Sequence, residues 1–200
     1  MKNSWNEVSI TDWKAIKAIV ESDLEPLEKN VNTIAVLKGV SPKEIWNMPM
    51  GELKMITSSL DWMDDFSFNK RANFSKIKIE GQTYDITTDL NKLSVAAYAD
   101  FQFYMEKREE NMGLILTCFI VPQGKDYGDG YDVKELAQVF EDKLSIVFWN
   151  EVFFSLIKNS LYLIRASEIY LDWTARKDPE IQETLRKKMK DLKDMYGLPS

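Results

Sequence analysis

The sequence predicts a mainly α-helical fold, a compact multi-helix domain with one short antiparallel β-hairpin at about residues 76–87. Apolar residues recur every three or four positions over most of the chain, strict alternation is confined to residues 76–87, and glycine or proline separates the periodic segments. With 200 residues, 44% of them hydrophobic and 29% charged, the chain can bury a core without disulfides or metal. We expect a single domain over residues 1–200, divisible into an N-terminal helical part at 1–70 and a hairpin-plus-helical part at 71–200.

Two helices are expected before residue 40. Thr11 and Asp12 are expected to cap the first, and Gly39 is placed to end the second, because a residue without Cβ adopts a left-handed conformation without strain. The apolar positions are Trp13, Ile16, Ile19 and Val20 in the first helix and Leu24, Leu27, Val31, Ile34 and Leu37 in the second.

Residues 41–64 predict a short helix followed by a longer one. Ser41 and Glu44 have the spacing of a capping box, and Pro42 suits the first helical position between them. Pro49 then turns the chain into a helix from about Met50 to Asp64. The apolar face of that helix carries Leu53, Ile56, Leu60 and Met63.

The β-hairpin is predicted from residues 76–80 and 83–87, which alternate between polar and apolar around a turn at Gly81–Gln82. These are the only clear strands in the sequence. A two-stranded hairpin is marginally stable in water, so it must pack on helices or be extended by a strand of a partner.

The following segment predicts further helices interrupted by one loop. Residues 89–93 lead into a helix, and residues 113–121 form an apolar run whose β-branched content permits a strand but whose helical flanks favour a buried helix. Residues 122–131 form the longest expected loop, and Asp132 starts the next helix. The apolar positions of the first and last of these helices are Tyr98, Phe101, Tyr104, Met105 and Leu136, Val139, Phe140.

Two helices are expected at the end of the chain. The first runs from Leu144 to Asp172 and should be central to the domain, because its polar residues fall on one narrow stripe. The second starts at Pro179. The polar stripe of the first comprises Glu151, Ser155, Lys158, Arg165, Glu168 and Asp172, and the apolar face of the second comprises Ile181, Leu185, Met189 and Leu192.

The composition excludes several classes of function. Without histidine, Ser-His-Asp and Cys-His catalysis cannot operate, and the commonest transition-metal ligand is missing. The net charge of -6 repels phosphate backbones, so we expect no nucleic-acid partner. Cys118 is the only cysteine, which fits a reducing compartment. The N-terminus has no signal-peptide core, and the longest uncharged stretch, residues 111–124, is too short to span a bilayer, so we expect a cytoplasmic protein without a membrane partner.

Two acidic groups could in principle hold a metal ion. Asp61, Asp64 and Asp65 have helical spacing and could bind Mg²⁺ with a phosphate substrate, but phosphate-binding cations are not recognisable nearby. A second group, at residues 126, 129 and 132, departs from the spacing of a calcium loop. We therefore assign no catalytic, cofactor-binding or metal-binding residue, expect a non-enzymatic protein without cofactors, and expect Cys118 to be an inert core thiol.

Aromatic residues are the candidates for partner binding. Large aromatic side chains concentrate at the centres of protein interfaces, although most of those in a chain belong to its own core. The candidate partner-binding residues are Trp46, Trp62, Phe148, Trp149, Phe153 and Phe154.

Residues 33–49, which read TIAVLKGVSPKEIWNMP, join an apolar helix to a capped turn and a further helix, and a hairpin with a helix ending in Asp100-Phe101-Gln102 follows. This arrangement, mainly over residues 11–105, resembles tail-assembly-chaperone-like proteins of tailed bacteriophages, particularly phages infecting Bacteroidetes. The resemblance implies a viral protein in virion assembly, a chaperone that keeps the helical tape-measure protein or another tail protein soluble in the host cytoplasm and that can self-associate.

Three alternatives remain open at the level of sequence. One is a structural virion component, either a head–tail connector subunit or a tail subunit. Another is a small Mg²⁺-dependent enzyme that uses Asp61, Asp64 and Asp65. The third is an acidic regulator that mimics or sequesters nucleic-acid-binding proteins.

Overall fold

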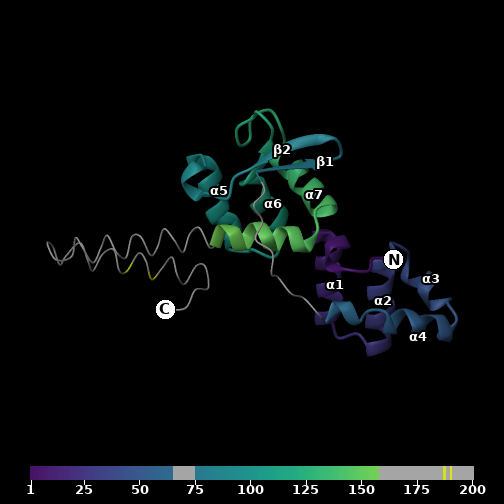
Figure 1. The fold of residues 1–200 in the computed structure, drawn as a ribbon. Helices are drawn as coiled ribbons and strands as arrows, with labels where there is room; N and C mark the ends of the chain where they lie inside the picture. Colours follow the sequence, from purple (N-terminus) through teal and green to yellow (C-terminus); the bar gives the residue numbers. More distant parts are fainter. Residues whose placement is uncertain (65–74, 158–186, 188–189, 191–200) are drawn as a thin grey trace.

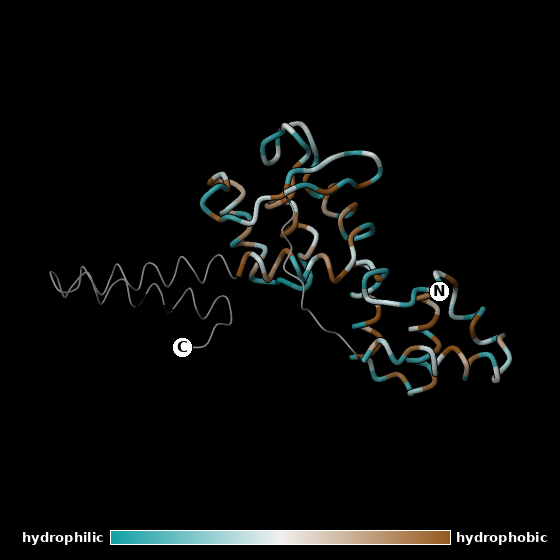
Figure 2. Tube along the Cα trace, in the orientation of Figure 1, coloured by the Kyte–Doolittle hydropathy of each residue, from teal (hydrophilic) through white to brown (hydrophobic). Residues whose placement is uncertain are grey.

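A computed structural model describes residues 1–64, 75–157, 187 and 190, and it confirms a mainly α-helical fold with a small antiparallel sheet (Figure 1). Four helices, labelled α1 to α4 in Figure 1, precede the sheet in the chain, and further helices pack around the sheet. Figure 2 shows hydrophobic and hydrophilic residues alternating along the helices, as expected for helices with one apolar face.

The N-terminal helices pack around α2, which contacts its three neighbours. Their small core is apolar and buried, and it consists of Val31, Ile34, Ala35, Ile45 and Leu53. The elements are η1 (Trp5–Glu7), α1 (Ile10–Glu21), α2 (Pro26–Lys38), α3 (Pro42–Trp46), α4 (Met50–Ser58) and η2 (Asp61–Met63), where η denotes a 3-10 helix.

The turn between α2 and α3 follows the sequence prediction. Gly39 ends α2 with a left-handed backbone at φ 66°. The backbone N–H of Ser41 donates to Glu44 Oε1 at 3.0 Å, and the Ser41 side chain accepts from the Glu44 N–H, so the predicted capping box is confirmed.

The expected cap of α1 at Thr11–Asp12 is wrong, because Ser9 caps the helix. The Ser9 side chain accepts from the Asp12 N–H at 3.1 Å, and the Asp12 carboxylate accepts from the Ser9 N–H at 3.1 Å. Asp12 therefore serves as the third residue of a capping box, a place that glutamate or glutamine usually takes.

The single helix expected from Met50 to Asp64 is also wrong in its length. α4 ends at Ser58, and the chain makes a turn before the 3-10 helix η2. Thr57 Oγ1 donates to Leu53 O at 2.9 Å and Ser59 Oγ donates to Ile56 O at 2.7 Å. Such local hydroxyl bonds compete with helical backbone bonds and favour a helix end.

The sheet has three strands in the order β1-β2-β3, all antiparallel. The hairpin of β1 (Lys76–Ile79) and β2 (Gln82–Ile86) confirms the predicted hairpin. Its turn lies one residue earlier than expected, at Glu80 (φ 49°) and Gly81 (φ 89°), because Gln82 pairs with Ile79 in the ladder. β3 (Ile120–Pro122) adds a third strand, in a segment whose sequence permits a strand but favours a buried helix.

The run at residues 113–121 is helical in its first part and a strand in its last part. α6 (Met112–Thr117) confirms the helix for the first part, and β3 replaces it from Ile120 onward. The strand forms because β2 offers it a pairing partner, with Ile86 opposite Ile120. That pairing joins residues far apart in sequence, so the β-branched content of the run could permit the strand but not decide it.

The helices that follow the β1–β2 hairpin in the chain pack on one face of the sheet. On β2, Tyr84 and Ile86 are buried toward the helices, and the Tyr84 ring lies 5.5 Å from the Phe140 ring of α7. The elements are η3 (Leu90–Lys92), α5 (Val95–Met105), α6, α7 (Val133–Lys143) and a helix at residues 146–157. Residues 89–93 thus form a capped 3-10 turn, and Ser94 caps α5.

The larger core connects the N-terminal helices with the sheet. It includes Val8, Ile10, Ile16 and Leu37 together with side chains of β2, α5, α6, α7 and residues 146–157. Ile10 N donates to Leu144 O at 3.1 Å and Ile146 N donates to Val8 O at 2.9 Å. These backbone bonds hold the start of α1 against the end of α7.

The helix expected from Leu144 begins at residue 146, because Leu144 ends α7 and the Ser145 side chain accepts from the Phe148 N–H at 3.1 Å. Residues 146–157 are helical as predicted. The expected continuation through Lys158, Arg165, Glu168 and Asp172, and the apolar positions expected after Pro179, lie outside the described residues.

Candidate partner-binding site

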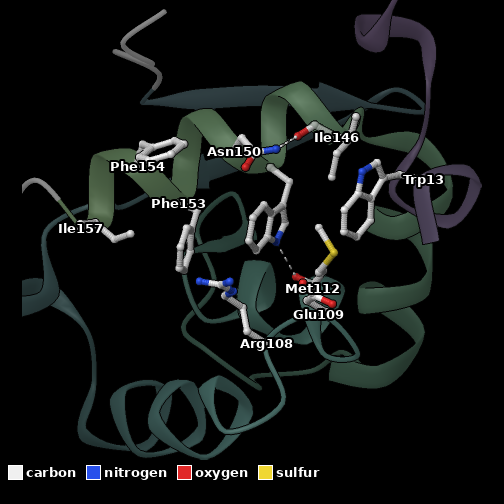
Figure 3. A pocket seen from close by; sticks show the side chains of 10 residues that line it. Trp13, Arg108, Glu109, Met112, Ile146, Asn150, Phe153, Phe154 and Ile157 are labelled. Atoms are coloured by element: carbon white, nitrogen blue, oxygen red, sulfur yellow. Dashed lines mark hydrogen bonds between the residues drawn. The ribbon is translucent and has the colours of Figure 1, made fainter. Parts of the chain in front are cut away.

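An open, largely apolar pocket of about 240 Å³ lies between α1, the start of α6 and the helix at residues 146–157 (Figure 3). Both aromatic and aliphatic side chains form its walls, with one arginine and one glutamate. The lining residues are Trp13, Arg108, Glu109, Met112, Ile146, Trp149, Asn150, Phe153, Phe154 and Ile157.

The helix at residues 146–157 supplies six of the lining residues. They follow one another three, one, three, one and three positions apart, which is the spacing of one helical face. Trp149 and Phe153 stack with ring centroids 4.7 Å apart and planes 13° apart. Trp149 Nε1 also donates to Met112 O at 3.3 Å, so the indole is fixed in both position and orientation.

The opposite wall carries the charges. The Arg108 guanidinium lies over the Phe153 ring at 5.3 Å, and Figure 3 shows the two side chains facing each other. Glu109 forms an ion pair with Lys17, whose ammonium also lies 5.9 Å from the Trp13 ring centroid. The hydrogen bond to Glu109 raises the pKa of Lys17, which therefore stays charged at neutral pH.

The structure brings three of the six candidate aromatics together at the pocket. Trp149 and Phe153 are each only 6% exposed, whereas Phe154 is 52% exposed. Phe148 is on the same helix but packs partly buried against the larger core. The side chains of Trp149 and Phe153 are therefore almost entirely buried in the pocket wall, and Phe154 is the most exposed of the three.

The other two candidates lie among the N-terminal helices. Trp46 ends α3 and is 50% exposed. Trp62 is partly buried in η2, and its ring meets the Trp5 ring edge-on at 5.2 Å. The six candidates thus do not form one continuous surface.

Several pocket residues were not identified as binding residues from the sequence. Trp13 has the apolar spacing of a core position, Ile146 belongs to the apolar helix expected from Leu144, and Met112 lies in the uncharged stretch of residues 111–124. Arg108 lies in the charged segment 106–110, where nothing in the local sequence indicates a binding role. An arginine that faces a stacked aromatic pair has no signature in local sequence, because the pair comes from another helix.

The acidic groups weighed for metal binding do not form a cluster in the described part of the chain, where no three metal-ligating side chains gather. Asp61 and Asp64 are exposed, and Asp65 lies outside the described residues. Asp132 instead caps α7, accepting from the backbone N–H groups of Lys134 at 2.7 Å and Glu135 at 3.1 Å.

Cys118 lies in the larger core at 2% exposure. Burial raises the pKa of the Cys118 thiol to about 12. Nearby, the Tyr127 hydroxyl donates to Asp100 at 2.8 Å, which ties the loop at residues 123–131 to α5. The thiol is thus held protonated beneath this loop.

We expect Cys118 to react slowly with Ellman's reagent in the native protein. At pH 8, a pKa of about 12 leaves roughly one thiol in ten thousand ionised, and burial restricts access further. In denaturant the same thiol should react to completion within minutes. Rapid native reaction would contradict a packed, protonated Cys118 and would indicate that the loop opens readily.

No helix among the described residues combines the length and hydropathy needed to cross a bilayer. Comparisons with protein-family models, curated proteins and solved structures gave no match to this chain.

Proposed function

We propose that this protein acts without catalysis in phage tail assembly, as a chaperone-like protein that binds a helical tail protein. Its partner is the tape-measure protein or another tail protein, held soluble until the tail tube forms around it. The protein acts in the host cytoplasm, before the virion is complete.

The observation that supports this proposal is the open apolar pocket along residues 146–157. Phe154 remains 52% exposed at its edge, beside the stacked pair of Trp149 and Phe153. Pockets of this kind, with aromatic side chains and one arginine, match the composition of energetically dominant regions in protein interfaces. The family resemblance of residues 33–49 supplies the second line of support.

Co-expression with the tape-measure protein of the same genome tests the proposal. We expect the wild-type chain to keep that protein in the soluble fraction and to co-purify with it. Phe154→Ala should weaken the complex by about 1–2 kcal/mol, or roughly tenfold, because truncating an interface aromatic removes apolar burial. The measurement is the dissociation of the purified complex on dilution, followed by dilution calorimetry.

The matched control is Phe103→Ala, since Phe103 is 65% exposed on α5 and does not line the pocket. Its affinity should stay within twofold of wild type. Equal losses in both variants would place binding elsewhere, and a tape-measure protein that stays insoluble with the wild-type chain would refute the proposal.

Purified virions distinguish the proposal from its nearest rival, a permanent head–tail connector or tail subunit. A chaperone should be missing from mass spectra of mature particles, whereas a structural subunit should appear at a fixed copy number. Detection at stoichiometric levels would favour the structural alternative.

A further inference from the structure

We infer that α5 (Val95–Met105) is a self-association surface, on which a second copy of this chain docks its own α5 in antiparallel orientation. The inference goes beyond the proposed function and does not rest on it. The surface, which we call the α5 face, consists of Val95, Ala96, Ala99 and Phe103.

α5 is apolar on nearly every side, although the protein covers only one of them. Asp100 is the only charged residue of the helix, and it accepts a hydrogen bond from the Tyr127 hydroxyl at 2.8 Å. On the inward side, the Phe101 ring meets the Phe119 ring edge-on at 4.9 Å in the larger core. A helix that is apolar all round is normally covered all round. The outward side of α5 therefore has the composition of a surface that another molecule covers.

The side chains of the α5 face are open to solvent. Val95 is 87% exposed and Phe103 is 65% exposed, and the two alanines between them are also exposed. Val95, Ala99 and Phe103 are four residues apart, so they form one ridge along the helix. Figure 1 shows α5 on the outer side of the helices that surround the sheet, where a second molecule can reach this ridge.

The order of side chains along the ridge is self-complementary. A two-fold axis through Ala99 places Phe103 of one copy beside Val95 of the other, and symmetry repeats that contact on the opposite side of the axis. Ala99 then lies at the crossing point, where its small side chain lets the two helix backbones approach closely. A second copy therefore supplies a large side chain wherever the first supplies a smaller one.

Charge also favours a second copy, and it favours the antiparallel orientation. Two chains of net charge -6 repel each other unless they meet through a neutral surface, and the α5 face carries no charge. Exposed Glu106 follows the ridge at the carboxyl end of α5, and exposed Lys92 precedes its amino end. Neither belongs to an ion pair within the described part of the chain. Antiparallel pairing brings Glu106 of each copy toward Lys92 and the helix N-terminus of the other, whereas parallel pairing would bring the two glutamates together.

The length of α5 sets the strength of the association. Eleven residues at 1.5 Å each give about 16 Å of helix contact. A contact of that length is smaller than the area of about 800 Å² per partner that is usual in stable interfaces. We therefore expect a reversible dimer with a dissociation constant on the order of 100 μM.

Sedimentation equilibrium of the full chain, at concentrations from about 5 to 1,000 μM, tests the inference. We expect a monomer–dimer equilibrium for the wild type. Ala99→Glu and Ala99→Lys should each weaken it roughly tenfold or more, because two like charges then meet at the two-fold axis. An equimolar mixture of the two variants should associate roughly fivefold more tightly than either variant alone, since opposite charges then face each other. Met55→Glu is the control of equal charge, because Met55 is 69% exposed on α4, and it should change the dissociation constant less than twofold.

The other outcomes overturn the inference. A wild type that stays monomeric at about 1 mM would do so, and so would a dimer that Ala99→Glu leaves unchanged or that Met55→Glu weakens equally. Weakening by both Ala99 variants without recovery in their mixture would show that Ala99 does not lie on a two-fold axis. A monomeric wild type that Ala99→Glu destabilises in thermal unfolding would show that the chain covers the α5 face itself. The tape-measure protein takes no part in this experiment, so its failure leaves the proposed function standing.

Discussion

Replacing Phe140 with alanine should lower the free energy of unfolding by about 3–5 kcal/mol, because it removes a fully buried aromatic ring. Phe140 has 0% exposure and lies where α7 meets the sheet. Its ring packs edge-on against Tyr84 at 5.5 Å, a geometry that contributes beyond simple apolar burial. Urea denaturation followed by far-ultraviolet circular dichroism measures the change.

Phe103→Ala provides the comparison for this substitution. Phe103 is 65% exposed on α5, so the same truncation there should cost less than about 1 kcal/mol. A loss at Phe140 no greater than that at Phe103 would show that α7 and the sheet are not packed through this ring.

The elements that were predicted correctly are those with complete local signals. Gly39 requires only its own backbone freedom to end α2, and the capping box of Ser41 and Glu44 spans four residues. The hairpin likewise carries its alternation and its turn within residues 76–86. Each of these patterns can be recognised without knowing what the rest of the chain does, although the hairpin still needs β3 and the helices to be stable.

The predictions that failed have two causes. One is a pairing between residues distant in sequence, and the other is an uncommon residue in a local capping motif. β3 forms because Ile120 pairs with Ile86, and the β-branched content of residues 113–121 permits a strand without revealing that partner. The α1 cap was missed for a different reason, since the capping residue Ser9 lies two residues before Thr11 and its box uses Asp12 in place of a glutamate. The first error reflects tertiary structure, and the second an unusual residue in a familiar motif.

The residues of the candidate site show the same distinction between local signals and tertiary packing. Trp149, Phe153 and Phe154 could be found from the sequence because they are aromatics on one apolar helix. Trp13 and Arg108 could not, because they reach the pocket only through the packing of α1 and of the turn before α6 against that helix. The charge at the pocket is therefore a product of the fold.

Gly113→Ala is expected to destabilise the protein by about 2–3 kcal/mol, because α6 and α7 approach too closely there for a Cβ. An added Cβ would lie 2.5 Å from Ala137 O and 2.6 Å from Glu141 Cγ. The first of these is a backbone atom, so α7 itself would have to move. The Gly113 N–H also donates to Glu141 Oε1 at 2.9 Å, a bond that such a shift would strain.

Gly51→Ala is the matched control, and it should have the opposite sign. Nothing lies within 4 Å of a Cβ built at Gly51, near the start of α4. Alanine there should raise stability by up to about 1 kcal/mol, because glycine is the poorer helix former. The same helix preference acts at Gly113. The measured loss of stability there therefore equals the cost of the α6–α7 clash minus this gain. If thermal unfolding showed both variants more stable than wild type, the close packing of α6 against α7 would be refuted.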